Sequence, residues 1–125
     1  MDENEIGREI VDSAIQIHRE TGPGLLESVY EVLHAYELEK KRLKVSRQIP
    51  IRLHYKGVYF DGGFRADIVV EDKVILELKS VTAITNVHKK QVLTYLKLSD
   101  RRLGYLLNFG QERMVDGIVR LVNEL

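Results

Sequence analysis

The sequence predicts a mixed α/β fold organised around a central β-hairpin. Residues 4–19 place apolar side chains at helical spacing, and residues 64–80 contain two runs that alternate with period two. Residues 102–109 form a nearly all-apolar run, which is typical of an interior strand. A chain of 125 residues is long enough for a sizeable core, so we expect one domain spanning residues 1–125.

The first two elements are expected to be helices. An amphipathic helix is predicted over Asn4–Arg19, and the Gly and Pro residues at positions 21–24 end it in a turn. Its apolar stripe comprises Ile6, Ile10, Ala14 and Ile17. A second helix is predicted over Leu25–Lys41. Its expected apolar face comprises Leu26, Val29, Leu33 and Tyr36.

Glu27 in the first turn of this second helix has two interpretations. If Gly24 is the N-cap, Glu27 occupies the third helical position, where a carboxylate reaches the cap N–H and the positive end of the helix dipole. That role accounts for an isolated Glu. The functional interpretation makes Glu27 a further carboxylate directed at the central hairpin. Position alone favours capping.

A charged connector over residues 42–46 leads to a strand within Val45–Tyr55. Ile49, Ile51 and Leu53 share one face of this strand, and Pro50 indicates an edge strand or a strand start. A hairpin turn is expected at residues 55–58, and Asp61-Gly62-Gly63 turns the chain into the central hairpin. The basic residues of this region are interpreted as a solvated face.

The central hairpin reads as two strands, Phe64–Val70 and Val74–Ser80, around a turn at residues 71–73. One face carries the apolar set Phe64, Ala66, Ile68, Val70, Val74, Leu76 and Leu78. The rows of the two strands share one core only if the loop has three residues or contains a bulge. That register places Asp67 opposite Glu77.

Adjacent carboxylates at Asp67 and Glu77 would repel and raise each other's pKa unless a cation lies between them. A hard ion such as Mg²⁺ is bound by one or two carboxylates with water and substrate phosphates. Lys79, on the same face, could then orient or deprotonate a water, or stabilise a phosphate. The structural interpretation is a surface ion-pair face, in which Arg65 and Lys79 neutralise the two acids.

After the hairpin, Thr85 or Asn86 is expected to cap a helix that ends near Leu98, in which Val87, Leu93 and Leu96 need burial. His88, Gln91 and Tyr95 share one face of this helix. Gln91 and Tyr95 could bind a phosphate, or else Tyr95 packs at the core edge and Gln91 faces solvent. An interior strand follows over residues 102–109. Residues 114–122 form a final short strand or helix.

Composition narrows the function classes. The absence of cysteine excludes disulfides, thiolate zinc sites and cysteine nucleophiles. No apolar run predicts a membrane span, and the acidic N-terminus does not resemble a signal peptide, so a cytoplasmic protein is expected. The net charge is zero, but residues 1–39 hold 10 acidic and 2 basic residues, leaving the remainder basic. The basic part could face phosphate.

Taken together, Asp67, Glu77-Leu78-Lys79 and Gln91-x-x-x-Tyr95 resemble the PD-(D/E)XK nuclease superfamily. The run from Gly24 to Tyr30 resembles the signature of its GxxExxY branch. The resemblance covers almost the whole chain. Ala66 stands where the name-giving proline would be, which is tolerable because that proline carries no chemistry.

The resemblance implies a restriction-endonuclease-like mixed sheet flanked by helices, with core order α-β-β-β-α-β. It implies that Asp67, Glu77 and Glu27 bind Mg²⁺ or Mn²⁺ and that Lys79 assists the attacking water. Gln91 and Tyr95 would arrange the site. The expected substrate is nucleic acid, DNA in preference to RNA, and a small nuclease of this kind could dimerise around it.

Two alternatives stay open. In the first, the protein is a non-catalytic module that retains the nuclease fold and binds nucleic acid or a protein, with its acids in an ion-pair network. In the second, it is a structural or oligomeric partner protein, which predicts no effect of divalent ions on the melting temperature.

Overall fold

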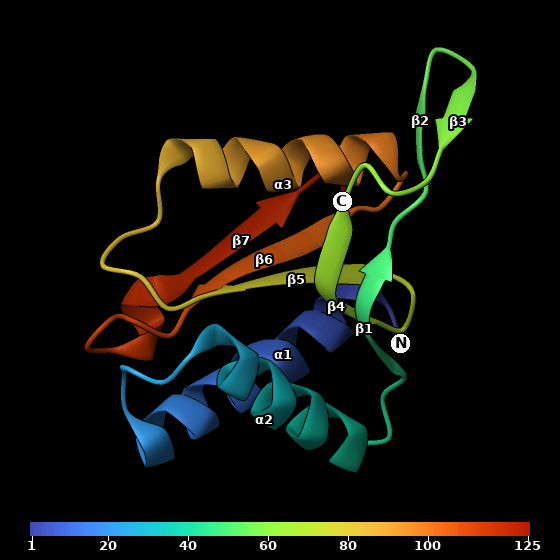
Figure 1. Ribbon diagram of the computed structural model, residues 1–125. Helices are drawn as coiled ribbons and strands as arrows, with labels where there is room; N and C mark the ends of the chain where they lie inside the picture. The colour runs from blue at the N-terminus through green and yellow to red at the C-terminus, as the bar shows by residue number, and fades with distance from the viewer.

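A five-stranded mixed sheet lies at the centre of the protein, with strand order β1-β4-β5-β6-β7 (Figure 1). The structure is a computed structural model that describes residues 1–125. The strands are β1 (Val45–Pro50), β4 (Arg65–Val70), β5 (Val74–Lys79), β6 (Leu103–Asn108) and β7 (Ile118–Val122). β5 and β6 pair in parallel and the other neighbours are antiparallel. The strand β1 lies at an edge of the sheet, which is one of the two alternatives that Pro50 indicated; Pro50 ends this strand and does not start it.

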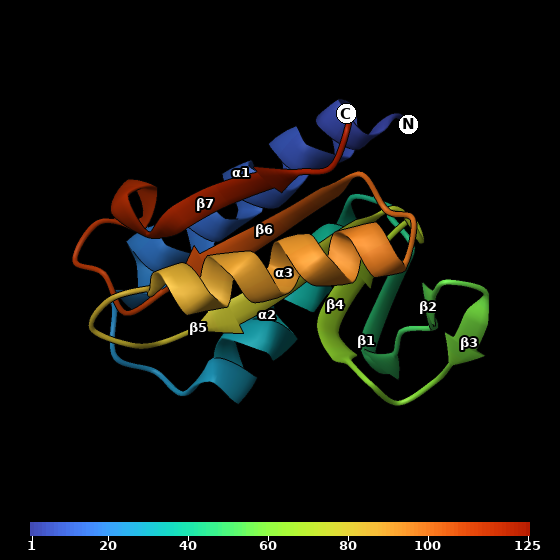
Figure 2. The ribbon, with the colours of Figure 1, turned by 90° about the horizontal axis from the view of Figure 1, so that it is seen from above.

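Helices cover both faces of this sheet, and each face has its own apolar core. Helices α1 (Glu3–Thr21) and α2 (Glu27–Lys40) lie on one face, and α3 (Asn86–Leu98) lies on the other (Figures 1 and 2). The predicted α1 stripe is buried, and Thr85 caps α3 as expected. None of the three helices combines the length and apolar character needed to cross a membrane.

A small two-stranded hairpin, β2 (Leu53–Tyr55) and β3 (Val58–Phe60), projects from the body of the protein (Figures 1 and 2). Its turn lies where the sequence predicted it, with Lys56 and Gly57 both in the left-handed region. The last segment, left open between strand and helix, contains both. The 3-10 helix η1 (Met114–Gly117) leads directly into β7.

The predicted register of the central hairpin is confirmed. Val70 pairs with Val74 and Ile68 with Leu76, which sets Asp67 level with Glu77. The turn uses left-handed backbone at Glu71 and Asp72, with φ of 55° and 56°. The Lys73 amide closes the turn on the Val70 carbonyl, so Lys73 is the extra residue between the paired strands. No glycine is needed at Lys73 because the left-handed positions precede it.

The prediction of one unbroken apolar face on this hairpin is wrong. Ile68 and Val70 pack in the core beneath α1 and α2, whereas Phe64 and Ala66 pack with the core beneath α3. The chain changes face at Asp67, whose side chain points sideways into the space between β4 and β5. The alternation of period two holds only where the backbone ladder is continuous.

The predicted apolar face of α2 is also wrong. Leu26 is 72% exposed and Tyr36 is 59% exposed, while the buried side of α2 is built on Tyr30, His34 and Leu38. In α3, the expected burial of Leu96 is confirmed, whereas Val87 is 63% exposed and Val92 is buried instead.

Candidate active site

The site is centred on a fork where β4 and β5 part. Regular pairing ends at Ile68 and Leu76, and beyond that point side chains replace backbone partners. The Leu78 amide donates to Asp67 Oδ2 at 2.9 Å, and the Asp67 amide donates to Glu77 Oε1 at 3.2 Å. Each carboxylate therefore fills a gap in the ladder, which fixes both acids at the mouth of the fork.

Both carboxyl groups have unusual electrostatics. Burial raises the pKa of Glu77 to about 8, and the neighbouring charge of Asp67 adds to the shift. Burial also raises the pKa of Asp67, although its hydrogen bonds from the Leu78 amide and Gln48 oppose the change. Lys79 acts on both groups in the opposite direction, because its positive charge favours the carboxylates. The pair is held at an electrostatic cost, which is common at functional sites.

Glu77 opens into a cavity of about 150 Å³ between β5 and α3. The cavity is lined by Phe64, Glu77, Lys79, His88, Gln91, Val92, Tyr95 and Leu106. The structure thus brings together four of the six predicted site residues, and a further one, Asp67, is hydrogen-bonded to Glu77 at the fork. The amine of Lys79 makes no hydrogen bond or ion pair within the protein. It is therefore free to act on a ligand.

An aromatic stack closes one side of this cavity. The rings of Phe64 and Tyr95 lie parallel, with centroids 3.7 Å apart and an interplanar angle of 10°. Tyr95 is thus both core-edge packing and cavity wall. His88 lines the cavity too, and its Nδ1 accepts a hydrogen bond from the Thr85 amide in the cap of α3.

Glu27 does not have the capping role that the sequence favoured. The N-cap of α2 is Leu26, so Glu27 is the first helical residue and not the third. Its Oε2 accepts a hydrogen bond from the Ser80 amide at 3.1 Å. Because the amides of Leu78 and Ser80 project from the same edge of the chain, Asp67 and Glu27 occupy successive positions along the edge that β4 leaves free.

The rest of the Gly24-x-x-Glu27-x-x-Tyr30 motif holds the loop before α2. Gly24 adopts a φ of 104°, a backbone conformation that would be strained for any residue with an L side chain. The buried Tyr30 donates its hydroxyl to the Gly22 carbonyl at 2.6 Å and accepts from the Leu25 amide. These contacts fix the chain that carries Glu27 to the end of β5.

The residues that hold Asp67 from the other side were not predicted from the sequence. Gln48 donates to Asp67 Oδ1 at 3.2 Å and to Glu31 Oε1 at 2.6 Å. Glu31 is buried and also forms an ion pair with Arg47, whose Nη2 lies 2.9 Å from Glu31 Oε2. A second Glu one helical turn after Glu27 was the available signal, since residues four apart share a helix face.

The carboxylates fit a hard divalent cation in their chemistry. When ionised, Asp67 and Glu77 are adjacent carboxylates that offer oxygen lone pairs, the ligand type that such an ion prefers. No group of three or more His, Asp or Glu side chains lies close enough together to hold a metal ion. The structure therefore pairs Asp67 with Glu77 and leaves Glu27 apart, beside Ser80.

The fold and site together define an α/β protein with a paired-acid and lysine site at a parting of two sheet strands. A family model described as the PD-(D/E)XK nuclease superfamily matches residues 4–121. The chain belongs to this superfamily, which confirms the restriction-endonuclease-like fold that the sequence motifs implied. No curated protein and no solved structure matches the chain.

Proposed function

We propose that this protein is a metal-dependent nuclease that hydrolyses phosphodiester bonds in DNA. The observation that carries the proposal is the cavity in which Lys79, Gln91 and Tyr95 converge on Glu77, directly beside Asp67. Membership of a nuclease superfamily supports the reaction class. Metal dependence and the choice of DNA rest on the chemistry of the site and on the motif resemblance.

Asp67 and Glu77 would hold the cation, Mg²⁺ or Mn²⁺, which supplies positive charge and Lewis acidity at the scissile phosphate. Lys79 would orient the attacking water and help to remove its proton, because its amine is the one free cationic group in the cavity lining. Gln91 and Tyr95 would position the phosphate. Glu27, hydrogen-bonded to the Ser80 amide at the end of the same edge, would supply a further carboxylate for the cation.

The projecting hairpin offers a surface of the right type for nucleic acid. Tyr55 and Tyr59 are largely exposed. Lys56 lies over the ring of Tyr55, and Arg52 lies over the ring of Tyr59. Exposed aromatic rings with cationic neighbours are the usual means of contacting unpaired bases and their backbone. The chain runs from this hairpin directly into Phe64, a wall of the cavity.

The test is cleavage of labelled single- and double-stranded DNA with Mn²⁺, with Mg²⁺ and with EDTA. Cutting that requires the metal, disappears in Lys79→Ala and persists in Lys97→Ala would support the proposal. Lys97 is the control because it is an exposed lysine of α3, the helix that covers the cavity, and lies outside the cavity lining. Cutting of RNA alone would change the substrate, and no cutting by folded protein would favour the non-catalytic binding module.

A further inference from the structure

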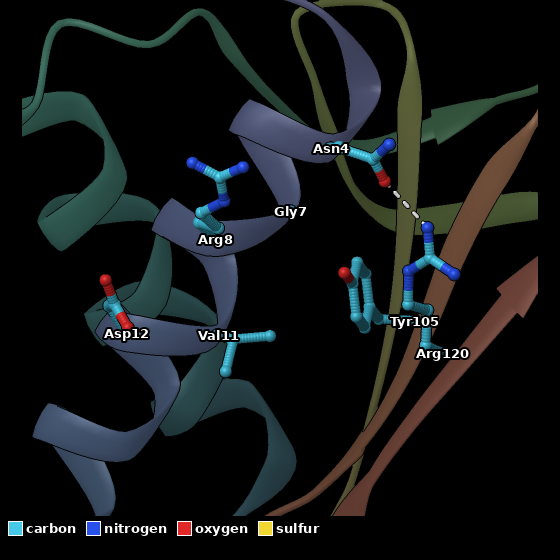
Figure 3. A pocket seen from close by; sticks show the side chains of 7 residues that line it. All are labelled: Asn4, Gly7, Arg8, Val11, Asp12, Tyr105 and Arg120. Carbon is cyan, nitrogen blue, oxygen red and sulfur yellow. Dashed lines mark hydrogen bonds between the residues drawn. The ribbon is translucent and has the colours of Figure 1, made fainter.

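A second cavity lies on the opposite face of the sheet from Glu77. It has a volume of about 440 Å³ and lies between α1 and the strands β6 and β7 (Figure 3). Its lining comprises Asn4, Gly7, Arg8, Val11, Asp12, Tyr105 and Arg120. Tyr105 and Leu106 are neighbours in β6 and point to opposite faces, so the sheet separates this cavity from the one lined by Leu106.

The floor of this cavity holds a tyrosine hydroxyl that has no hydrogen-bond partner within the protein. Tyr105 is only 4% exposed, and its hydroxyl makes no hydrogen bond within the protein. Figure 3 shows the hydroxyl directed toward α1. Gly7 makes room for it, because a Cβ at that position would lie 2.5 Å from the Tyr105 oxygen. The hydroxyl therefore keeps both its donor and its acceptor capacity for a ligand in the cavity.

Two guanidinium groups line the same cavity. Arg120 lies beside Tyr105 in the sheet and donates from Nη2 to Asn4 Oδ1 at 2.7 Å, which steadies the side chain and leaves its other donors free. Neither Arg120 nor Arg8 forms an ion pair within the protein. Asp12 is the one acidic residue in the lining, and Figure 3 shows its carboxylate directed away from Tyr105.

We propose that this cavity binds a small phosphate monoester, with Arg120, Arg8 and the Tyr105 hydroxyl donating to the phosphate oxygens. Guanidinium groups match phosphate oxygens in shape and charge, and the tyrosine hydroxyl adds a third donor. The cavity exceeds what a phosphate group alone would fill and is within the usual range of about 300–1,000 Å³ for sites of small organic ligands. Val11 and the Tyr105 ring provide apolar surface for the organic part. This binding is independent of the proposed nuclease activity.

Binding would be measured by calorimetry and by NMR shifts of backbone amides, with 2′-deoxyadenosine 5′-monophosphate, inorganic phosphate, deoxyadenosine and succinate as probes. We expect the monophosphate to bind once per chain, phosphate more weakly, and the nucleoside not to bind. The shifted amides should belong to residues 4–12, 105 and 120. Shifts confined to Glu77 and Lys79 would overturn the proposal, as would equal binding of deoxyadenosine or of succinate.

Three variants localise the contact. Arg120→Gln keeps a donor for Asn4 but removes the charge, and Tyr105→Phe removes only the hydroxyl, so each should weaken binding of the monophosphate at least tenfold. Arg19→Gln, at an exposed arginine of α1 outside the cavity, should leave the affinity unchanged. Thermal melting shows whether each variant is folded. Unchanged affinity in folded Arg120→Gln and Tyr105→Phe would refute the site.

Discussion

Asp67 and Glu77 are each tied to the strand that carries the other. The Asp67 amide donates to Glu77 Oε1, and the Leu78 amide, next to Glu77, donates to Asp67 Oδ2. This exchange holds two acids side by side although their charges repel and burial disfavours their ionised forms. The backbone of the fork, more than the side chains alone, therefore preorganises the site.

The first prediction concerns Glu77 in metal-free protein. Its pKa of about 8 in the folded state lies above the ordinary value of 4.5, so the folded state holds an extra proton between these pH values. The contribution of Glu77 to stability is therefore complete below pH 4.5 and is lost as pH rises through about 8. Glu77→Gln stays neutral and can still accept from the Asp67 amide. We expect this variant to be more stable than the wild type by on the order of 2 kcal/mol at pH 7.

Urea unfolding in EDTA at pH 5, 7 and 8.5 would measure this difference, which should grow with pH. Glu39→Gln, at an exposed glutamate of α2, is the matched control and should show no such trend. A stability gain that stays constant across the pH range would show that Glu77 is ionised throughout.

The register of the central hairpin was predictable because the period-two pattern of residues 68–76 fits only one pairing of the buried rows. The change of face at Asp67 was not. It depends on the Asp67 side chain, which accepts a backbone hydrogen bond from Leu78 in place of a strand partner. A pattern of apolar residues does not predict such a bond. The predicted site residue Asp67 and the failure of the pattern thus coincide at one position.

The second prediction concerns Gln48, whose amide links Asp67 to Glu31. Gln48 adopts φ of 49° within an edge strand, and non-glycine residues there are uncommon. Gln48→Asn tolerates this backbone but shortens the reach to Asp67. If Asp67 is a metal ligand, losing this support should lower the rate of DNA cleavage about ten- to a hundredfold.

The control for this change is Gln16→Asn, at an exposed glutamine of α1 whose side chain makes no hydrogen bond. Circular dichroism should show both variants folded. Wild-type cleavage by Gln48→Asn would mean that Asp67 is held well enough by the Leu78 amide alone.

The third prediction separates the two roles of Tyr95. Tyr95→Phe keeps the ring stacked on Phe64 and should leave the melting temperature unchanged, while cleavage falls about tenfold if the hydroxyl positions the phosphate. Tyr95→Ala also removes the stack and should cost about 2 kcal/mol of stability. Tyr36→Phe, at an exposed tyrosine of α2, is the control. Equal activity of Tyr95→Phe and the wild type would leave Tyr95 a purely structural wall.

The buried side of α2 could not be predicted from the sequence because the apolar residues of this helix are distributed around its whole circumference. Leu26, Val29 and Tyr36 formed the more regular stripe, yet the structure buries polar Glu31 and His34 on the opposite side. Their partners, Arg47 and the Ile10 carbonyl, lie on other elements. Burial of a polar side chain is decided by such distant partners, which local periodicity does not contain.

The last prediction concerns His34, which is fully buried between α2 and α1. Its Nε2 lies 3.1 Å from the Ile10 carbonyl, and Nδ1 has no partner. Burial lowers the pKa of His34 from 6.5 to about 4, since the charged ring would lose its hydration. The unfolded chain binds the proton first, so stability falls as pH drops from 6.5 to about 4. The full loss would be on the order of 3 kcal/mol.

Two measurements test this expectation. Imidazole NMR should show the His34 ring neutral until pH approaches 4. Unfolding should be followed in Glu77→Gln, because protonation of Glu77 over the same range would stabilise the wild type and mask the effect. A His34 ring that titrates near 6.5 in folded protein would show that water reaches Nδ1, and that the seam between α1 and α2 is open.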